Sequence, residues 1–423
     1  MKTEQKVPEL LAPAGNREKL TAAIHYGANA VYLGGPSWSL RAQAGNFDRP
    51  GLREAVNYAH QKGVKVYVTV NIFAHNRDLN GLEDYLLFLR EAGADAVIVA
   101  DPGILLLCRE TVPDMPLHLS TQANVTNKAS VLFWAEQGVA RINLARELGL
   151  EEIRTIRHAK PDIALEVFVH GALCISYSGR CLLSSYMTGR SANQGDCAHP
   201  CRYSYRLVEE KRPGQYFPVE EDERGTYIFN SRDLCLLFRL PELAAAGVNS
   251  VKIEGRMKSA GYVGAAVRIY RAALDYIKEQ REKGLPWDQI ILPPLFQEEI
   301  NKVGTRGQTE NFFVTAPSSE AMLYDKMREN QVSAPVGIVR SNSPLLVETR
   351  NVLEIGDRIE HLGRRLEPTV CTVLAMTAAD GTEVSRANPG CMVALILEPE
   401  PDNLQINDLF RKTFVQQPRQ PTT

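Results

Sequence analysis

The sequence predicts a TIM-like (β/α)8 barrel followed by a small C-terminal β-barrel domain. Short β-rich runs alternate with segments whose apolar residues recur at helical spacing, which is the pattern of consecutive βαβ units around a parallel sheet. Several helical segments end on a glycine just before the next run, as in HYGANA and EAGADA, and glycine is the usual C-terminal helix cap. From about residue 331, short alternating strands broken by turns predict the second, all-β unit.

Eight strands and their helices are expected in the first unit. The strands are residues 8–15, 30–35, 64–71, 96–101, 117–125, 141–147, 164–171 and 250–255. The helices include residues 17–27, 51–62, 78–92, 128–137, 149–159, 235–246 and 261–283. Eight strand–helix units over roughly 280 residues suit a closed barrel. An open doubly wound sheet is the alternative, but no GxGxxG follows the first strand.

The expected domain boundaries follow from these changes of pattern. Residues 1–283 form the barrel, which carries a cysteine-rich insertion at about 174–235. Residues 284–330, with four prolines, are expected to be a linker, and residues 331–400 the small β-barrel. The last 23 residues, 401–423, end in a Pro- and Gln-rich stretch and are expected to be a tail.

Composition limits the class of protein. The 423 residues are 44% hydrophobic and 23% charged, which is ordinary for a globular chain, and the net charge of −2 does not favour a nucleic-acid partner overall. The N-terminus has no apolar run suited to a signal peptide, and no stretch of about 18 apolar residues suggests a membrane span. We therefore expect a cytoplasmic protein with reduced thiols and no membrane partner.

A cluster of cysteines follows the seventh strand. Cys174, Cys181, Cys197 and Cys201 are spaced C-x6-C-x15-C-x3-C, and Cys235 comes later. The surrounding segment is rich in Gly, Ser and Asn, so it reads as a loop, and barrel active sites form on the face where this loop emerges. In a chain without an export signal, such a cluster indicates a metal or iron–sulfur site before it indicates disulfides.

The identity of the metal stays open at this point. Four thiolates complete the coordination of an iron–sulfur cluster, and the wide gaps between the cysteines favour one. Zinc also binds four cysteines, but its usual C-x2-4-C spacing is met only by Cys197 and Cys201. A catalytic or structural thiol is the third alternative. Cys235 is an alternative fourth ligand.

Polar side chains gather at the predicted C-terminal ends of the strands, where burial is costly unless they meet a partner or a ligand. The alternative for each is a helix cap or a salt bridge. The candidates for catalysis are Arg41, Arg146, His170, Glu254 and Arg256. The candidates for substrate binding are Ser39, Asn46, Asn71, Gln122, Asn124 and Lys258. The cations among them predict a pocket for an anionic substrate, because guanidinium groups pair bidentately with carboxylate or phosphate.

Two other activities can be weighed from the residues. A protease would need a nucleophile or a metal motif, and neither HExxH nor GxSxG occurs. His170 and Cys174 could form a dyad, but no orienting partner is evident. Residues 174–212 contain six Lys and Arg against three acids, with tyrosines interleaved, a mixture that would suit RNA. A solvated loop would have the same composition.

Several long motifs resemble the peptidase U32 family, also called collagenase-like peptidases. They are ELLAPAGN (9–16), STQANVTN (120–127), NLARE (143–147), EVFVHGALCISYSGRCLLSSYM (166–187), NQGDCAHPCR (193–202) and SVKIEGRMKSAGYV (250–263). The resemblance covers residues 9 to about 283, and the later β domain fits the family's common C-terminal barrel. Among the members, the chain is most similar to those that hydroxylate tRNA.

The resemblance implies an iron–sulfur enzyme that makes 5-hydroxyuridine at the tRNA wobble position, without dioxygen and dependent on prephenate. It implies a 4Fe-4S cluster on Cys174, Cys181, Cys197 and Cys201, prephenate on Arg41, Arg146 and Arg256, and the tRNA anticodon region as partner. An electron-donor protein or a homologous partner subunit is a further candidate partner. Other members act on a ribosomal cytidine or a quinone precursor, and the family name implies a peptidase. At Cys235 the chain differs from the RNA-modifying members, which lack a cysteine there, whereas the quinone-pathway members use a later cysteine as fourth ligand; the fourth ligand therefore stays open.

Overall fold

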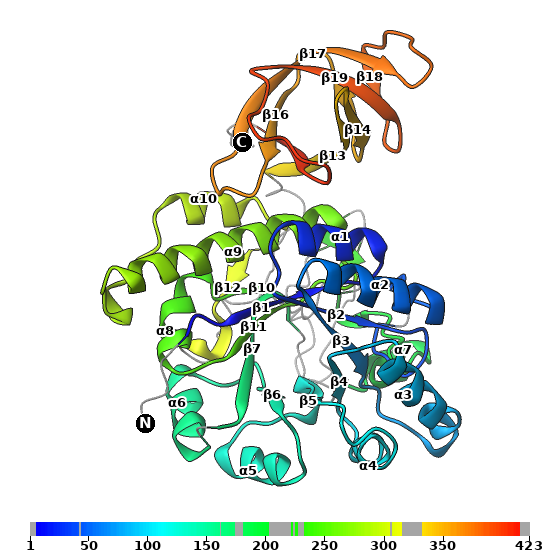
Figure 1. Cartoon of the computed structure of the whole chain (residues 1–423), viewed down its shortest axis with the longest axis vertical. Helices are drawn as coiled ribbons and strands as arrows, with labels where there is room; N and C mark the ends of the chain where they lie inside the picture. The colour runs from blue at the N-terminus through cyan, green and yellow to red at the C-terminus, as the bar shows by residue number, and fades with distance from the viewer. Residues whose placement is uncertain are drawn as a thin grey trace, which may run out of the picture.

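The computed structural model describes residues 6–41, 44–160, 162–173, 181–202, 221–222, 225–226, 232–304, 307–314 and 332–414. These residues form a larger α/β domain and a smaller all-β domain, which stand one above the other in Figure 1. Helices α1, α9 and α10 lie on the side of the larger domain that faces the smaller one. No helix among the described residues is long and apolar enough to cross a membrane.

Eight parallel strands close the larger domain into a barrel, so the predicted (β/α)8 fold is confirmed. Each strand pairs with the next along the chain, and the last pairs with both the first and the seventh. The strands are β1 (Glu9–Pro13), β2 (Ala30–Gly34), β3 (Lys65–Val70), β4 (Ala96–Val99), β5 (Leu117–Leu119), β6 (Arg141–Asn143), β7 (Ala164–Ala172) and β11 (Ser250–Ile253).

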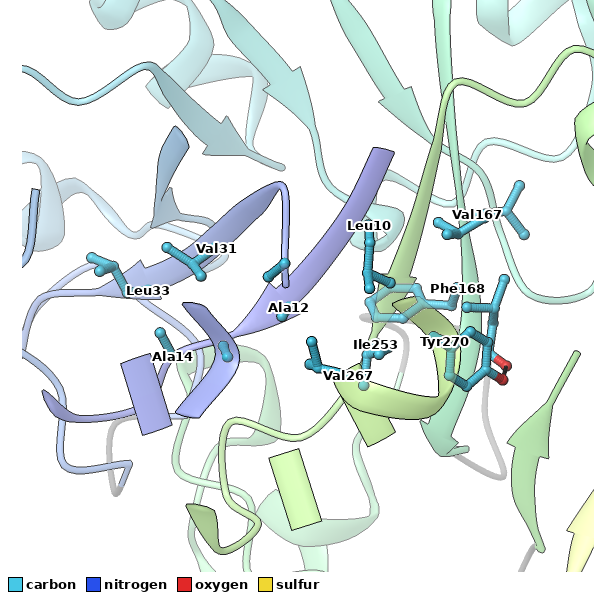
Figure 2. Packing of buried hydrophobic residues seen from close by; sticks show 14 of the residues in the cluster. Leu10, Ala12, Ala14, Val31, Leu33, Val167, Phe168, Ile253, Val267 and Tyr270 are labelled. Carbon is cyan, nitrogen blue, oxygen red and sulfur yellow. Dashed lines mark hydrogen bonds between the residues drawn. The ribbon is translucent and has the colours of Figure 1, made fainter. Parts of the chain in front are cut away.

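Helices surround this barrel. They are α1 (Arg17–His25), α2 (Arg49–Gln61), α3 (Leu82–Glu91), α4 (Pro102–Thr111), α5 (Lys128–Glu136), α6 (Leu150–Ala159), α8 (Leu240–Ala245) and α9 (Ala260–Glu282). Their apolar faces pack on the outward side chains of the strands; Figure 2 shows Leu10 and Ala12 of β1 near Val267 of α9. Burial of this cluster, at about 25 cal/mol per Å² of apolar surface, supplies most of the driving force for folding.

The inside of the barrel holds a buried ion network that was not expected from the sequence. Arg141 donates to Glu9 at 2.6 Å and to Glu166 at 3.4 Å, and Lys252 donates to Glu166 at 2.9 Å. Burial raises the pKa of Glu166, but Lys252 and Arg141 outweigh burial and hold that pKa below its usual value. Since Glu9 and Arg141 begin their strands, these charges fill the N-terminal end and leave the other end for a site.

Two further strands extend the sheet beside β7. Strand β10 (Asp233–Cys235) runs antiparallel to β7 and pairs Cys235 with His170, and β12 (Gln308–Thr309) follows it. Strand β12 and helix α10 (Leu295–Asn301) fall in the segment that the sequence suggested was a linker. The prolines of this segment suggested a linker. Pro293 and Pro294, however, lie just before α10, a position where proline does not interrupt a helix.

The smaller domain is a closed six-stranded antiparallel barrel, as predicted. Its strand order is β13, β14, β19, β17, β16, β20. The bounds are β13 (Ser333–Asn342), β14 (Leu345–Thr349), β16 (Arg358–Leu362), β17 (Thr369–Ala378), β19 (Met392–Glu398) and β20 (Leu409–Thr413); β15 (Leu353–Glu354) and β18 (Arg386–Ala387) pair separately. Strand β20 lies in the segment 401–423 that was expected to be a tail. That expectation was wrong for β20, whose pairing with β13 and β16 closes the barrel.

Polar contacts between buried side chains join the two domains. Asp408, just before β20, accepts hydrogen bonds from His25 of α1 and His361 of β16, each at 2.7 Å. The hydroxyl of Tyr26 donates to the carbonyl of Leu362 at 2.6 Å. These groups are almost completely buried, so each lost partner would leave an unsatisfied polar atom inside the interface.

We expect Asp408→Asn to destabilise the chain by about 3 kcal/mol, because the amide keeps the volume but loses the charge that both imidazoles contact. Burial raises the pKa of Asp408, but the hydrogen bonds from His25, His361 and the Gln405 backbone outweigh it and lower that pKa. The carboxylate therefore stabilises the fold above the ordinary aspartate range, and this contribution disappears as the pH falls through the lowered pKa.

Urea denaturation of the full chain across the acid range measures this effect. Wild type should lose stability on acidification more steeply than Asp408→Asn does. Asp402→Asn, an exposed change in the same loop, is the control. Equal stability of wild type and Asp408→Asn at neutral pH would show that the carboxylate does not hold the domains together.

Candidate functional site

The described part of the cysteine segment, residues 181–202, lies over the loops that follow β2 and β3. The backbone N–H of Phe73 donates to the carbonyl of Asn193 at 3.1 Å, and Gln194 donates to Asp78 at 3.3 Å. Gly195 has a φ of 91°, and a Cβ there would lie 2.9 Å from the carbonyl oxygen of Ser39. The segment therefore lies at the C-terminal face of the barrel, beside β2 and β3, where the site was expected.

Three of the four predicted ligands are described. Cys181 precedes the short helix α7 (Leu183–Thr188), and Cys197 and Cys201 follow it; all three are of intermediate exposure and form no disulfide. Cys174 lies outside the described residues. Within the described ranges, no three His, Cys, Asp or Glu side chains are arranged to hold a metal ion.

The chemistry of this donor set suits an iron–sulfur cluster. The thiols are unbridged and within reach of solvent, unlike structural core cysteines. The Sγ of Cys197 accepts the backbone N–H of His199 at 3.3 Å, and hydrogen bonds to cysteine sulfur are one means by which proteins adjust cluster potentials. The Ser184 hydroxyl accepts a hydrogen bond from the backbone N–H of Ala198 at 3.0 Å, which joins α7 to the loop that carries Cys197.

Cys235 has a different environment. It is buried in β10, its Sγ lies 3.8 Å from the hydroxyl of Tyr270, and burial raises the pKa of its thiol. A buried, protonated thiol in a strand is the pattern of a core cysteine. Cys108 and Cys371 are also buried, whereas Cys391 is exposed.

A carboxylate surrounded by arginines lies at the mouth of the barrel. Glu254 follows β11, and Arg41 Nε lies 3.9 Å from its Oε1. Burial raises the pKa of Glu254, but Arg41, Arg146 and Arg256 outweigh burial and lower that pKa, so Glu254 is ionised. Gly171 crosses directly behind it, where a Cβ would lie 2.4 Å from the Glu254 carbonyl oxygen.

Arg146 is held by two contacts of β7. Its Nη1 donates to the carbonyl of Ala172 at 2.9 Å, and its guanidinium carbon lies 3.9 Å from the centre of the Phe168 ring. Its Nε is buried and meets no acceptor among the described residues. Three guanidinium groups around one carboxylate leave an excess of two positive charges, which suits a dianion.

Arg256 is a positioning residue rather than an exposed anion ligand. It is 3% exposed, and it donates to Ser39 at 2.8 Å, to Thr69 at 3.0 Å and to Asn46 at 2.6 Å. Burial is the main reason why its pKa falls to about 10, so it stays cationic at neutral pH. These bonds fix the loop after β2 that presents Arg41. Thr69 was missed from the sequence, although its inward position in β3 could have indicated it.

We expect Arg256→Lys to release this loop, because an ammonium group cannot reproduce three bonds of a planar guanidinium. The free energy of unfolding should fall by about 2 kcal/mol. The backbone amides of Ala44 and Phe47, which donate to the carbonyls of Arg41 and Gly34, should exchange faster with deuterium. Arg53→Lys on the exposed side of α2 is the control. Unchanged exchange at both amides would refute the positioning role.

Amide side chains line the ends of β3, β5 and β6. Asn71 donates to Gln122 at 2.6 Å, and Ser120 donates to the same Oε1 at 2.7 Å. The Nε2 of Gln122, the Oδ1 of Asn124 and both amide atoms of Asn143 are buried, with no partner among the described residues. Asn143 was not singled out from the sequence. Unsatisfied amides inside a protein are costly, so these groups are suited to a polar ligand.

His170 and Lys258 lie apart from the arginines, beside β10. His170 is 2% exposed, its Nδ1 lies 3.5 Å from the Tyr270 hydroxyl, and burial is the main cause that lowers its pKa to about 4, so it is neutral. Lys258 lies 3.7 Å from Asp233 and over the Tyr262 ring. From the sequence, both were expected in the same site as Arg41, but their described side-chain contacts are with other residues.

Residues 15–323 match the model of peptidase family U32. The chain belongs to this family. The matched U32 region contains every site residue above, whereas β13 to β20 lie beyond it.

Curated relatives extend the U32 comparison to nearly the whole chain. The tRNA hydroxylation protein P1 of Bacillus subtilis is 39% identical over 386 residues, which cover 90% of each chain. The tRNA hydroxylation protein P of Escherichia coli is 38% identical over 84% of this chain and 85% of its own. The 23S rRNA 5-hydroxycytidine C2501 synthase of Escherichia coli is 37% identical over 78% of this chain and 48% of its own.

Proposed function

We propose that this U32 protein is an enzyme that hydroxylates tRNA, converting the wobble uridine to 5-hydroxyuridine. The observation that carries the proposal is its similarity to two proteins named for tRNA hydroxylation, which extends over 84% or more of each chain and so reaches into the β domain. A relative named for a hydroxycytidine in ribosomal RNA indicates that the barrel serves hydroxylation of a pyrimidine in RNA more generally.

The finer parts of the proposal concern the cofactor and the co-substrate. Cys174, Cys181, Cys197 and Cys201 would hold a 4Fe-4S cluster, which supplies one-electron redox chemistry at the barrel mouth when bound. The excess of two positive charges around Glu254 would bind prephenate, a dicarboxylate, through Arg41 and Arg146. No dioxygen is needed in this proposal.

The amides at the ends of β3, β5 and β6 would receive the base. A pyrimidine carries both donors and acceptors on its edge, and Asn143 and Gln122 offer unpaired groups of both kinds. The wobble base must leave its stack to reach them inside the barrel. Phosphate contacts would come from cations on the same face, of which Arg190, paired with Asp196, is one.

Nucleoside analysis of total tRNA tests the reaction. A strain that lacks this gene should lose 5-hydroxyuridine, and a plasmid copy should restore it, while ribosomal RNA and quinone stay unchanged. Loss of a ribosomal base or of quinone instead would identify one of the other substrates. Anaerobically purified protein should be brown, with about four irons and four sulfides per chain. Colourless protein holding one zinc would overturn the redox mechanism.

The peptidase activity in the family name gains no support from the described residues. His170, the candidate base, is buried against Tyr270 and Tyr262, and its presumed nucleophile, Cys174, lies outside the described residues. Pure, metal-loaded protein that cleaves gelatin would revive this alternative.

We expect Glu254→Gln to reduce 5-hydroxyuridine by at least about tenfold, because three guanidinium groups would lose their buried counter-charge and the pocket would change shape. The readout is the ratio of 5-hydroxyuridine to uridine at position 34 in the complemented deletion strain. Asp101→Asn is the matched control, since Asp101 also follows a barrel strand but only caps α4. Full modification by Glu254→Gln would remove Glu254 from the site.

A further inference from the structure

A cavity of about 270 Å³ lies at the junction of the two domains, beside the barrel mouth rather than within it. Its described walls come from the start of α9, the turn after α10, and strands β13, β16 and β20. No part of the proposed tRNA reaction uses this cavity. Its volume is just below the usual range of about 300–1,000 Å³ for drug-sized ligands, so a molecule with a single ring would fill it.

The polar side of this cavity is cationic. Lys258, Lys302 and Arg411 line it, and none of the described lining residues is an acid. Arg411 is 4% exposed; its Nε and Nη2 donate to Glu360 at 2.5 Å and to Glu299 at 2.6 Å. Its Nη1 meets no acceptor among the described residues. The unused Nη1 leaves Arg411 with hydrogen-bonding capacity that the described residues do not meet.

The start of α9 adds to the positive electrostatic potential of the cavity. The helix has 23 residues, its N-cap Ser259 lines the cavity, and so does Gly261 in its first turn. The positive end of the helix dipole therefore points toward the same space as the cations. Each of the three cations pairs with an acid, and these acids, Asp233, Glu299 and Glu360, are outside the described lining.

Part of the cavity wall is apolar. Val303, Leu362, Leu409 and Phe410 line it. A bare phosphate would leave this wall without contacts, whereas an organic acid would bury a hydrocarbon body against it. We propose that this interdomain cavity binds one small organic carboxylate, with its anionic group among Lys258, Lys302 and Arg411 and its body against Leu362 and Leu409.

Such a ligand would contact both domains at once. It would favour the docked arrangement by mass action, so its binding should raise the melting temperature of the full chain. The proposal is independent of the hydroxylation reaction, because it concerns binding alone and needs neither cluster nor RNA.

Calorimetric titration of the purified full chain with benzoate tests the proposal, with inorganic phosphate as the second probe. Ala265→Leu extends a side chain of α9 into the cavity without removing a charge. Ala272→Leu is the matched control, because it lies two helical turns further along α9 and does not line the cavity. Lys258→Gln removes one cation, and Arg41→Ala removes a cation from the barrel mouth.

We expect saturable benzoate binding that weakens by at least about tenfold in Ala265→Leu and in Lys258→Gln. Ala272→Leu and Arg41→Ala should bind as wild type does, and melting curves confirm that every variant is folded. Binding that survives Ala265→Leu but is lost in Arg41→Ala would place the ligand at the barrel mouth and overturn the proposal. Phosphate binding as tight as benzoate binding would overturn the choice of an organic ligand, and absence of saturable benzoate binding would overturn the site.

Discussion

Replacement of Cys197 with alanine is expected to abolish both the iron–sulfur absorbance and 5-hydroxyuridine formation. A cluster that loses one of four thiolates loses its closed coordination, so the expected effect is total rather than graded. Cys197 is the most informative target because its sulfur accepts the His199 N–H, while its side chain lies outside the buried core. The fold should therefore survive the change.

Absorbance of anaerobically prepared protein and nucleoside analysis of tRNA are the two readouts. Cys391→Ala, an exposed thiol on the β domain, is the control and should keep both. Cys201→Ala and Cys235→Ala then identify the fourth ligand. If Cys201 is the ligand, Cys235→Ala keeps the cluster and costs only the stability of a small cavity. A cluster retained in Cys197→Ala and Cys181→Ala alike would rule out the whole ligand set.

The sequence was sufficient for the barrel because each strand and helix carries a local signal. Buried strands such as Ala96–Val99 are continuous apolar runs, and the glycines that follow the helices mark their ends. The predictions that were wrong concern elements without such a local signal. Strand β20 follows the polar stretch PDNLQIND, and only its partners β13 and β16 show that it belongs to the closed barrel. Pairing between residues far apart in sequence leaves no local trace.

The types of residue at the candidate site could be predicted from the sequence, but which of them lie together could not. Polar residues at strand ends were recognised one by one, and Arg41, Arg146, Arg256 and Glu254 do converge. Arg256 donates its hydrogen bonds to Ser39, Thr69 and Asn46. These contacts depend on the directions of the side chains, which cannot be predicted from the order of the residues. His170 and Lys258 carried the same signal, yet their described contacts are with Tyr270 and Asp233.

Arg268→Leu should destabilise the chain by about 3–5 kcal/mol, the largest stability effect expected of any single change here. Arg268 of α9 is almost completely buried; it donates to Glu299 at 2.9 Å and to the carbonyls of Gly363, Arg365 and Leu366 in the β domain. Burial lowers the pKa of Arg268, and Glu299 opposes that shift. Leucine would leave three carbonyls and a carboxylate without this donor.

Denaturation of the full chain and limited proteolysis between the domains measure the loss, with Lys278→Ala on the exposed face of α9 as control. Removing Glu299 as well should not rescue Arg268→Leu, because Glu299 also accepts from Arg411 at 2.6 Å and from Lys302 at 3.0 Å. Rescue by the double change would mean that Arg268 and Glu299 form an isolated pair. Absence of rescue would mean that α9, α10 and the β domain share one network, and that the cavity beside Arg411 depends on it.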